Sequence, residues 1–247
     1  MPFALLQESL EQTISRAELE DASMAAHSVA RADCALLQRE LFGIVVGNLP
    51  YEDAVALQAA LRARNFPTEL VEQSALPALP PAKRETGLKL TEDGLWLVDL
   101  YGREQLYPKE KCVFAAAGHI LRLRQRVAGQ HEEVIVRGQY GNYSQMVTDY
   151  RLQNVPEFRL ETFFSVEPFR LQWILDPDNT LIINGQPAGF RNQTRLDALF
   201  KQLAALLPKK RVNLGIRKLS TGDYLVYPSV RAFEEEIVWS FYRLMRG

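Results

Sequence analysis

The proline-rich stretch SALPALPPAKRE, residues 74–85, most constrains how this chain folds. Proline has a fixed φ and no backbone N–H, so its three prolines favour an extended connection over a helix interior or an inner strand. With 247 residues, the chain is long enough for a domain on each side of this connection. The sequence therefore predicts an N-terminal α/β unit, a proline-rich linker and a β-rich α+β domain, over 1–73, 74–85 and 86–247.

The start of the N-terminal unit is predicted to be helical. Ser15 and Glu18 have the spacing of a capping box, in which two side chains satisfy backbone N–H groups at the beginning of a helix. Asp33 is predicted to cap a second helix over 33–41, because aspartate is favoured at that position.

A strand, a helix and a second strand are predicted to follow. Ile44–Val46 is a β-branched run that favours a buried strand. Ala54, Leu57 and Leu61 share one face of a helix, with Pro50 expected at its first position, and FPTELVEQ supplies the second strand. In its order of elements, this unit resembles the small ferredoxin-like modules, although a resemblance of this kind implies no function.

A glycine between a strand and a helix raises the question of phosphate binding. A Walker A loop needs a lysine and a hydroxyl residue beside its glycines, and neither follows Gly47. Glu52 and Asp53 would repel a phosphate at the start of the helix, whereas they suit its positive dipole end. We therefore interpret this turn as scaffold.

The second domain shows short strands. Two strands are expected to form a hairpin that turns at Tyr101-Gly102, and alternating residues predict two more strands on either side of Gly118. A further strand is predicted over 132–140, and 138–157 is expected to be a long loop.

Strong strand and helix signals follow. Phe169, Leu171, Trp173 and Leu175 alternate with Arg170, Gln172 and Ile174, the composition of Asp176–Asn179 favours a turn, and Asn184-Gly185 favours a type I′ turn. Thr194 and Asp197 suggest a capping box for a helix that ends before Pro208. The helical period predicts that its apolar face consists of Leu196, Leu199, Phe200, Leu203, Leu206 and Leu207. Strands are then predicted over 211–219 and 223–228, before a closing helix over 229–247. The order resembles a pleckstrin-like barrel closed by a helix.

Few side chains offer catalytic or metal chemistry. Three histidines and two cysteines show no metal-ligand spacing, so we expect no catalytic residue, no cofactor and no metal. One alternative is an enzyme of unrecognised class that uses scattered carboxylates or Cys112, whose thiol follows Lys109 and Lys111. The glutamates 234–236 are interpreted as a solvated first helical turn.

Charge is divided unequally along the chain. Residues 1–80 hold 5 basic and 11 acidic residues, a net of −6, and the remaining 24 basic and 19 acidic residues give +5. Two basic stretches could contact phosphates, which leaves nucleic-acid binding as a second alternative. They comprise Arg122, Arg124 and Arg126 on one strand, and the 209–218 segment with Lys209, Lys210, Arg211, Arg217 and Lys218. A pI near 6.4 and the lack of a recognition motif make nucleic acid the weaker hypothesis.

The sequence as a whole favours a non-catalytic binding or regulatory module of the cytoplasm. Trp239 and Tyr242 lie on the apolar closing helix, so a protein partner or a second copy of the chain is the expected contact there. No apolar run is long enough to predict insertion into a membrane.

Overall fold

The computed structural model describes residues 1–98, 101–127, 132–138, 141–147, 150–191 and 193–246, with the side chains of 124–152 and of 193 outside that description. The described chain contains both helices and mostly antiparallel sheets, and its strands between residues 83 and 189 follow one another without an intervening α-helix, which confirms the α+β class. The sheets contain three, five and five strands, and a separate two-stranded ribbon completes the β structure.

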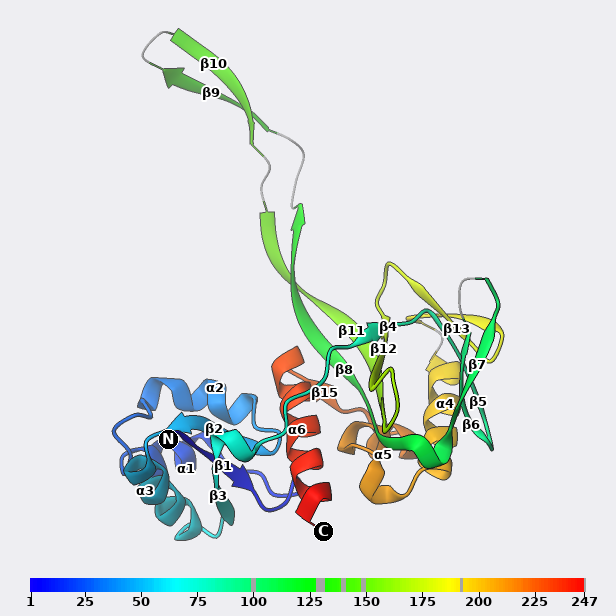
Figure 1. Ribbon diagram of the computed structural model, residues 1–247. Coiled ribbons are helices and arrows are strands. Elements are labelled where there is room, and N and C mark those ends of the chain that lie inside the picture. The colour runs from blue at the N-terminus through cyan, green and yellow to red at the C-terminus, as the bar shows by residue number, and fades with distance from the viewer. Residues whose placement is uncertain (99–100, 128–131, 139–140, 148–149, 192, 247) are drawn as a thin grey trace.

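The N-terminal unit packs helices against a three-stranded sheet, at the left of Figure 1. Its elements are β1 (Phe3–Gln7), α1 (Arg16–Ser23), α2 (Cys34–Arg39), β2 (Ile44–Leu49), α3 (Tyr51–Arg62) and β3 (Thr68–Glu72). The strand order is β2–β1–β3, and β1 is antiparallel to both neighbours. The predicted strand–helix–strand is therefore present, with β1 inserted between its two strands.

Strand β1 is absent from the sequence prediction, which expects helix there. Leu5 faces the cluster formed with the helices, while Ala4 and Leu6 belong to a second cluster on the opposite face. Because both faces of β1 are buried, its residues are nearly all apolar and do not alternate with polar ones. Such a short apolar run does not distinguish a strand from a helix by its period.

Two five-stranded sheets are formed by strands that follow β3 in the chain. One has the order β15–β8–β11–β12–β4 and the other β14–β13–β5–β6–β7. The strands of these sheets are β4 (Lys83–Arg84), β5 (Gly87–Thr91), β6 (Gly94–Val98), β7 (Glu104–Pro108), β8 (Cys112–Val127), β11 (Tyr150–Phe164), β12 (Arg170–Leu175), β13 (Thr180–Ile183), β14 (Gln186–Gly189) and β15 (Val226–Tyr227). In the part of the chain that the structure describes, they do not close into a single barrel, so the pleckstrin-like and ferredoxin-like details stay predictions.

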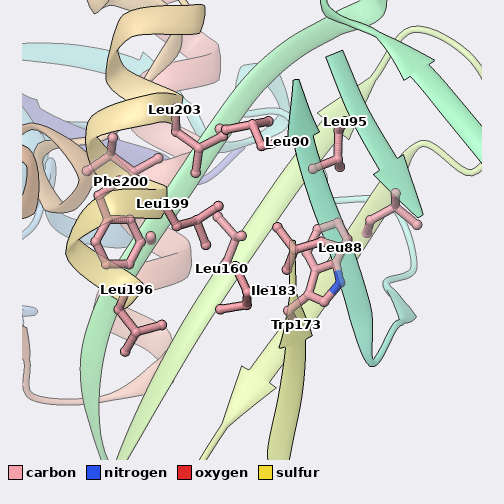
Figure 2. Packing of buried hydrophobic residues seen from close by; sticks show 14 of the residues in the cluster. Leu88, Leu90, Leu95, Leu160, Trp173, Ile183, Leu196, Leu199, Phe200 and Leu203 are labelled. Carbon is pink, nitrogen blue, oxygen red and sulfur yellow. The ribbon is translucent and has the colours of Figure 1, made fainter. Parts of the chain in front are cut away.

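Helix α4 (Gln193–Leu206) packs against both five-stranded sheets and, together with them, encloses the largest cluster of buried apolar side chains among the described residues. Figure 2 shows Leu196, Leu199, Phe200 and Leu203 of this helix facing apolar side chains from both sheets, including Trp173. Burial of these large apolar side chains is the principal source of stability in this half of the molecule. The apolar stripe predicted for this helix is confirmed.

Strands β8 and β11 extend beyond the body as a long antiparallel arm (Figure 1). The ribbon of β9 (Glu132–Gly138) and β10 (Gly141–Val147) lies at its far end. The predicted break at Gly118 and the predicted loop over 138–157 are both wrong, because β8 runs through the glycine and the loop region contains β10 and much of β11. Glycine is needed at position 118 because the Tyr227 ring packs directly against the backbone there. A Cβ at this position would lie 2.2 Å from Cε2 of Tyr227.

The predicted strand over 211–219 is also wrong. Residues Lys209–Arg211 form a 3-10 turn, η4, and Leu214–Thr221 form helix α5. Asn213 caps α5 by accepting a hydrogen bond from the Ile216 N–H, and Gly222 ends it in the left-handed region. The spacing of the apolar residues in this segment fits both a strand and a helix. The N-cap formed by Asn213 favours the helix.

Some of the predicted helix caps and turns are present in the structure and others are not. The Ser15–Glu18 capping box is confirmed, as are the hairpin of β6 and β7 and the left-handed Asn184-Gly185 turn. Asp33 makes no capping hydrogen bond, and Pro50 is the N-cap of α3 rather than its first residue.

Two further predictions in the second domain are wrong. Helix α4 begins at Gln193, so Thr194 lies inside it. Glu236 is fully buried rather than solvated, and its partners are described below.

Helix α6 (Val230–Arg246) lies between the N-terminal unit and the second domain (Figure 1). Phe233 and Ile237 pack in a cluster with side chains of β8 and β11, whereas Tyr242 packs with residues of β1 and β3. Trp239 Nε1 donates a hydrogen bond to the Gln7 carbonyl at 2.7 Å. Among the described helices, none combines the length and the apolar character needed to cross a membrane.

Candidate anion-binding site

A hollow of about 340 Å³ lies between η4, α5 and the C-terminal half of α6. We call it the basic pocket. Its lining residues are Lys209, Lys210, Val212, Arg217, Trp239, Ser240, Arg243 and Leu244. Four of these side chains are cationic and none is acidic, so the pocket concentrates positive charge although the whole chain carries a net charge of −1.

Local sequence explains how η4 and α5 reach this place. Pro208 ends the preceding helical region, and the Arg211 N–H donates to the Pro208 carbonyl at 2.7 Å to close the turn. Asn213 then fixes the segment against β8, because its Oδ1 accepts from the Ala117 N–H at 3.0 Å and its Nδ2 donates to the Ala117 carbonyl at 3.1 Å. The two lysines therefore come from η4 and Arg217 comes from α5, and Asn213 between these elements holds both of them against β8.

Three of the four cations form no close ion pair, although the charge of Arg217 acts on the buried Glu236 over a longer distance. Within the described part of the molecule, Lys209, Lys210 and Arg217 form no ion pair. Nε of Arg217 is buried and has no hydrogen-bond partner. A buried N–H without an acceptor costs free energy, and this atom has no exposed surface through which a ligand in the pocket could reach it. Anionic oxygens are the strongest acceptors for the lysine and arginine side chains that line the pocket.

Arg243 is held in place by the N-terminal unit. Its Nη1 lies 2.8 Å from a carboxylate oxygen of Glu69, and its Nη2 donates to the Gln7 carbonyl at 2.7 Å. Its guanidinium also lies 5.5 Å from the centroid of the Trp239 ring. Nε of Arg243 is buried without an acceptor, as is Nε of Arg217. The two terminal nitrogens of Arg243 therefore have partners, whereas its Nε has none.

The structure brings four of the sequence-predicted residues together. The basic pocket is lined by Lys209, Lys210, Arg217 and Trp239. Arg211 does not line it, because its Nη1 donates to the Cys112 carbonyl at 3.3 Å. Tyr242 does not line the pocket either, and its hydroxyl donates to Glu69 at 2.8 Å. Burial, and secondly this hydrogen bond, raise the pKa of Tyr242 to about 12.

The arginines of the arm lie elsewhere. Arg122 pairs with Glu157 at 3.2 Å, and the side chains of Arg124 and Arg126 lie outside the described residues. Ala115 forms a β-bridge with Val212 beside η4. Arg122 lies seven positions farther along the same strand, which corresponds to about 23 Å. The two predicted basic stretches therefore do not form one site through the described residues.

Sequence reasoning missed Arg243 and Ser240 and assigned Arg217 to a strand. The available signal was helical spacing, since Trp239 and Arg243 are four residues apart and share one face of the closing helix. That α5 would lie opposite this face could not be read from the chain, because α5 itself was predicted as a strand.

Other groups with chemical potential lie in less suitable places. Cys112 is buried, and the burial raises the pKa of its thiol to about 12, which keeps the thiol protonated at neutral pH. Glu236 is sealed in the core, where it accepts from the Tyr227 hydroxyl and from the Leu214 N–H at 2.6 Å. Burial raises the pKa of this carboxyl.

A row of buried charges crosses β11 and β12 but is internally satisfied. Arg159 lies 2.7 Å from Glu157, and Arg170 binds Glu161 through two nitrogens at 2.8 and 3.0 Å. Glu234 of α6 completes the pairing of Arg170 at 2.7 Å. Because these charges neutralise one another, the row has little attraction left for a ligand. The described residues also contain no group of three potential metal ligands.

Comparison of the chain with family models, with curated proteins and with solved structures finds no match. The function must therefore be argued from the basic pocket itself.

Proposed function

We propose that this protein is a binding module whose basic pocket takes the anionic group of a ligand. The observation that carries the proposal is the combination of four lining cations with no lining carboxylate. Charges of one sign repel one another and cost stability when they are held together. Lys209, Lys210, Arg217 and Arg243 form such an arrangement, and a bound anion would offset its cost.

The alternatives are less well supported. An enzyme that uses Cys112 would need an exposed thiolate, and this thiol is buried with a raised pKa. Nucleic-acid binding through both basic stretches would need continuous positive charge, and Arg122 is paired with Glu157 at a distance from the pocket.

Titration calorimetry on the full chain tests the proposal. The probes are inorganic triphosphate, a short polyglutamate peptide and a short single-stranded oligonucleotide, each at low ionic strength. We expect at least one of them to bind saturably, and Arg217→Gln to weaken that binding at least about tenfold, because hydrogen bonds to a charged group contribute about 1.5–3 kcal/mol.

Lys201→Gln provides the matched control. Lys201 is an exposed cation on α4 that does not line the basic pocket, so this variant removes the same charge elsewhere. Its affinity should equal that of the unaltered chain. The proposal would be overturned if no probe bound, or if both variants lost affinity equally, since the effect would then be one of net charge only.

A further inference from the structure

We propose that the ligand of the basic pocket is a compact phosphate ester with two or three phosphoryl groups on a small organic part. This inference rests on the proposed function and specifies which anion binds. Four features of the pocket support it: size, charge, donor content and apolar wall.

Size favours a small molecule. Small-molecule sites occupy about 300–1,000 Å³, and the basic pocket, at about 340 Å³, is near the lower limit. Its walls are supplied by η4, α5 and α6. A polymer would contact this hollow with one group only, whereas a small ligand could use all of its cations.

Charge favours more than one phosphoryl group. Three cations, Lys209, Lys210 and Arg217, have no ion pair in the described part of the chain, and Arg243 shares its charge with Glu69. A single phosphate monoester carries about −1.5 to −2 at neutral pH, which would leave at least one of the three unpaired. A carboxylate would leave two. A diphosphate or triphosphate matches the available positive charge.

Donor content points to phosphate rather than carboxylate. Lysine and arginine are donors only, and the pocket has no carboxylate that could accept from a ligand. Lys209 and Lys210 of η4, Arg217 of α5 and Arg243 of α6 place these donors on different walls of the hollow. A phosphoryl group offers three oxygens in a tetrahedral arrangement, so neighbouring phosphoryl groups can reach donors on different walls.

The apolar wall accounts for the organic part. Val212, Trp239 and Leu244 line the hollow beside the cations. Inorganic phosphates would leave these side chains in water, whereas an ester would bury part of its own apolar surface against them. The Trp239 ring already has the Arg243 guanidinium on one side, which fixes its orientation.

The test extends the same calorimetry to a graded series. The probes are AMP, ADP, ATP and inorganic triphosphate, with the polyglutamate peptide and the oligonucleotide for comparison. We expect affinity to rise at least about tenfold from AMP to ADP or ATP, which is the ratio expected when one further charge-assisted contact forms. ATP should also bind more tightly than inorganic triphosphate.

Two variants assign the effect to the pocket. Arg217→Gln should lose most of the difference between AMP and ATP, whereas Lys201→Gln should keep it. Arg217→Lys retains the charge without the planar pair of donors and should give an intermediate affinity. Circular dichroism and thermal melting confirm that each variant is folded before it is titrated.

Each outcome decides a different claim. If polyglutamate binds more tightly than ATP, or if oligonucleotide affinity grows with length beyond that of ATP, the ligand class proposed here is wrong while the anion-binding function stands. If AMP and ATP bind equally, the need for several phosphoryl groups is refuted. If inorganic triphosphate equals ATP, the organic part is refuted. If nothing binds, the function itself fails.

Discussion

At the scale of single residues, surroundings decide the chemistry more than residue type does. Glu236 has the sequence context of a solvated glutamate, yet it is fully buried with Tyr227 and Asn213 as partners. Cys112 follows two lysines that would favour a thiolate, yet desolvation is the largest influence and raises its pKa. In both cases burial by distant parts of the chain reverses the local expectation.

His119 gives a testable pH dependence at this scale. Its ring lies among Phe158, Phe190 and Tyr224, and its Nε2 is buried without a partner. Burial lowers its pKa below 6.5, and the charge of Asp197 on α4 offsets only part of this shift. Between the lowered native pKa and 6.5, the unfolded chain binds more protons than the native one, so this residue makes stability fall as the pH drops through that interval.

The measurement is urea denaturation of the native sequence and of His119→Phe at several values between neutral and mildly acidic pH. Phenylalanine keeps the ring contacts and removes the titration. We expect the variant to lose less stability on acidification, with the difference between the two chains appearing below pH 6.5 and levelling off below the native pKa. Parallel pH profiles would contradict the assignment.

At the scale of elements, caps and turns determine which structure an ambiguous segment adopts. The segment 211–219 has apolar residues that suit a strand, but Asn213 begins a helix there and Gly222 ends it. The Ser15–Glu18 box performs the same task for α1 in an exposed position. The two caps differ in burial, and this difference predicts how much each contributes.

Asn213→Ala should therefore destabilise the protein more than Ser15→Ala. Loss of an exposed cap costs about 1 kcal/mol. Asn213 is buried and also bonds the backbone of Ala117, so its removal leaves several buried groups unpaired and should cost about 2–4 kcal/mol. Chemical denaturation of both variants gives the comparison. Equal losses would show that the buried hydrogen bonds of Asn213 add nothing beyond the cap.

At the scale of the whole molecule, α6 joins the two halves. It packs on β8 and β11 through Phe233 and Ile237, and its other side carries Trp239 and Tyr242 toward β1. Glu69 of β3 accepts hydrogen bonds from Tyr242, Arg243 and Arg246 of this helix. The same helix supplies one wall of the basic pocket, so the pocket depends on how the halves are joined.

Trp239→Ala should weaken that junction. The change removes a large aromatic side chain packed against Gly43 and the hydrogen bond to Gln7, with an expected loss of about 2–4 kcal/mol. Urea denaturation measures the loss, and limited proteolysis within 76–82, between β3 and β4, should become faster. Phe169→Ala, which truncates a half-exposed aromatic residue, serves as the control and should change little. Equal effects of the two variants would argue against the junction.

The sequence alone determined the features that a few neighbouring residues encode. These are the capping box of α1, the β6–β7 hairpin, the Asn184-Gly185 turn and the apolar stripes of α3 and α4. The pocket residues Lys209, Lys210, Arg217 and Trp239 could also be named in advance, because cationic and aromatic residues can be recognised in any sequence. The α+β class followed from the same local signals.

Only the tertiary structure decided what depends on contacts between distant segments. Strand β1 is buried on both faces, which favours a strand there. Strand β8 continues past Gly118 without a break because it pairs with β11 on both sides of this glycine. The basic pocket arises in the same way, because Lys209, Arg217 and Arg243 become neighbours only when η4 and α5 fold back onto β8 and lie opposite α6. The physical reason is that burial and the proximity of charges depend on how the whole chain packs. The hydrogen bonds of caps and turns, in contrast, form between residues that are close in sequence.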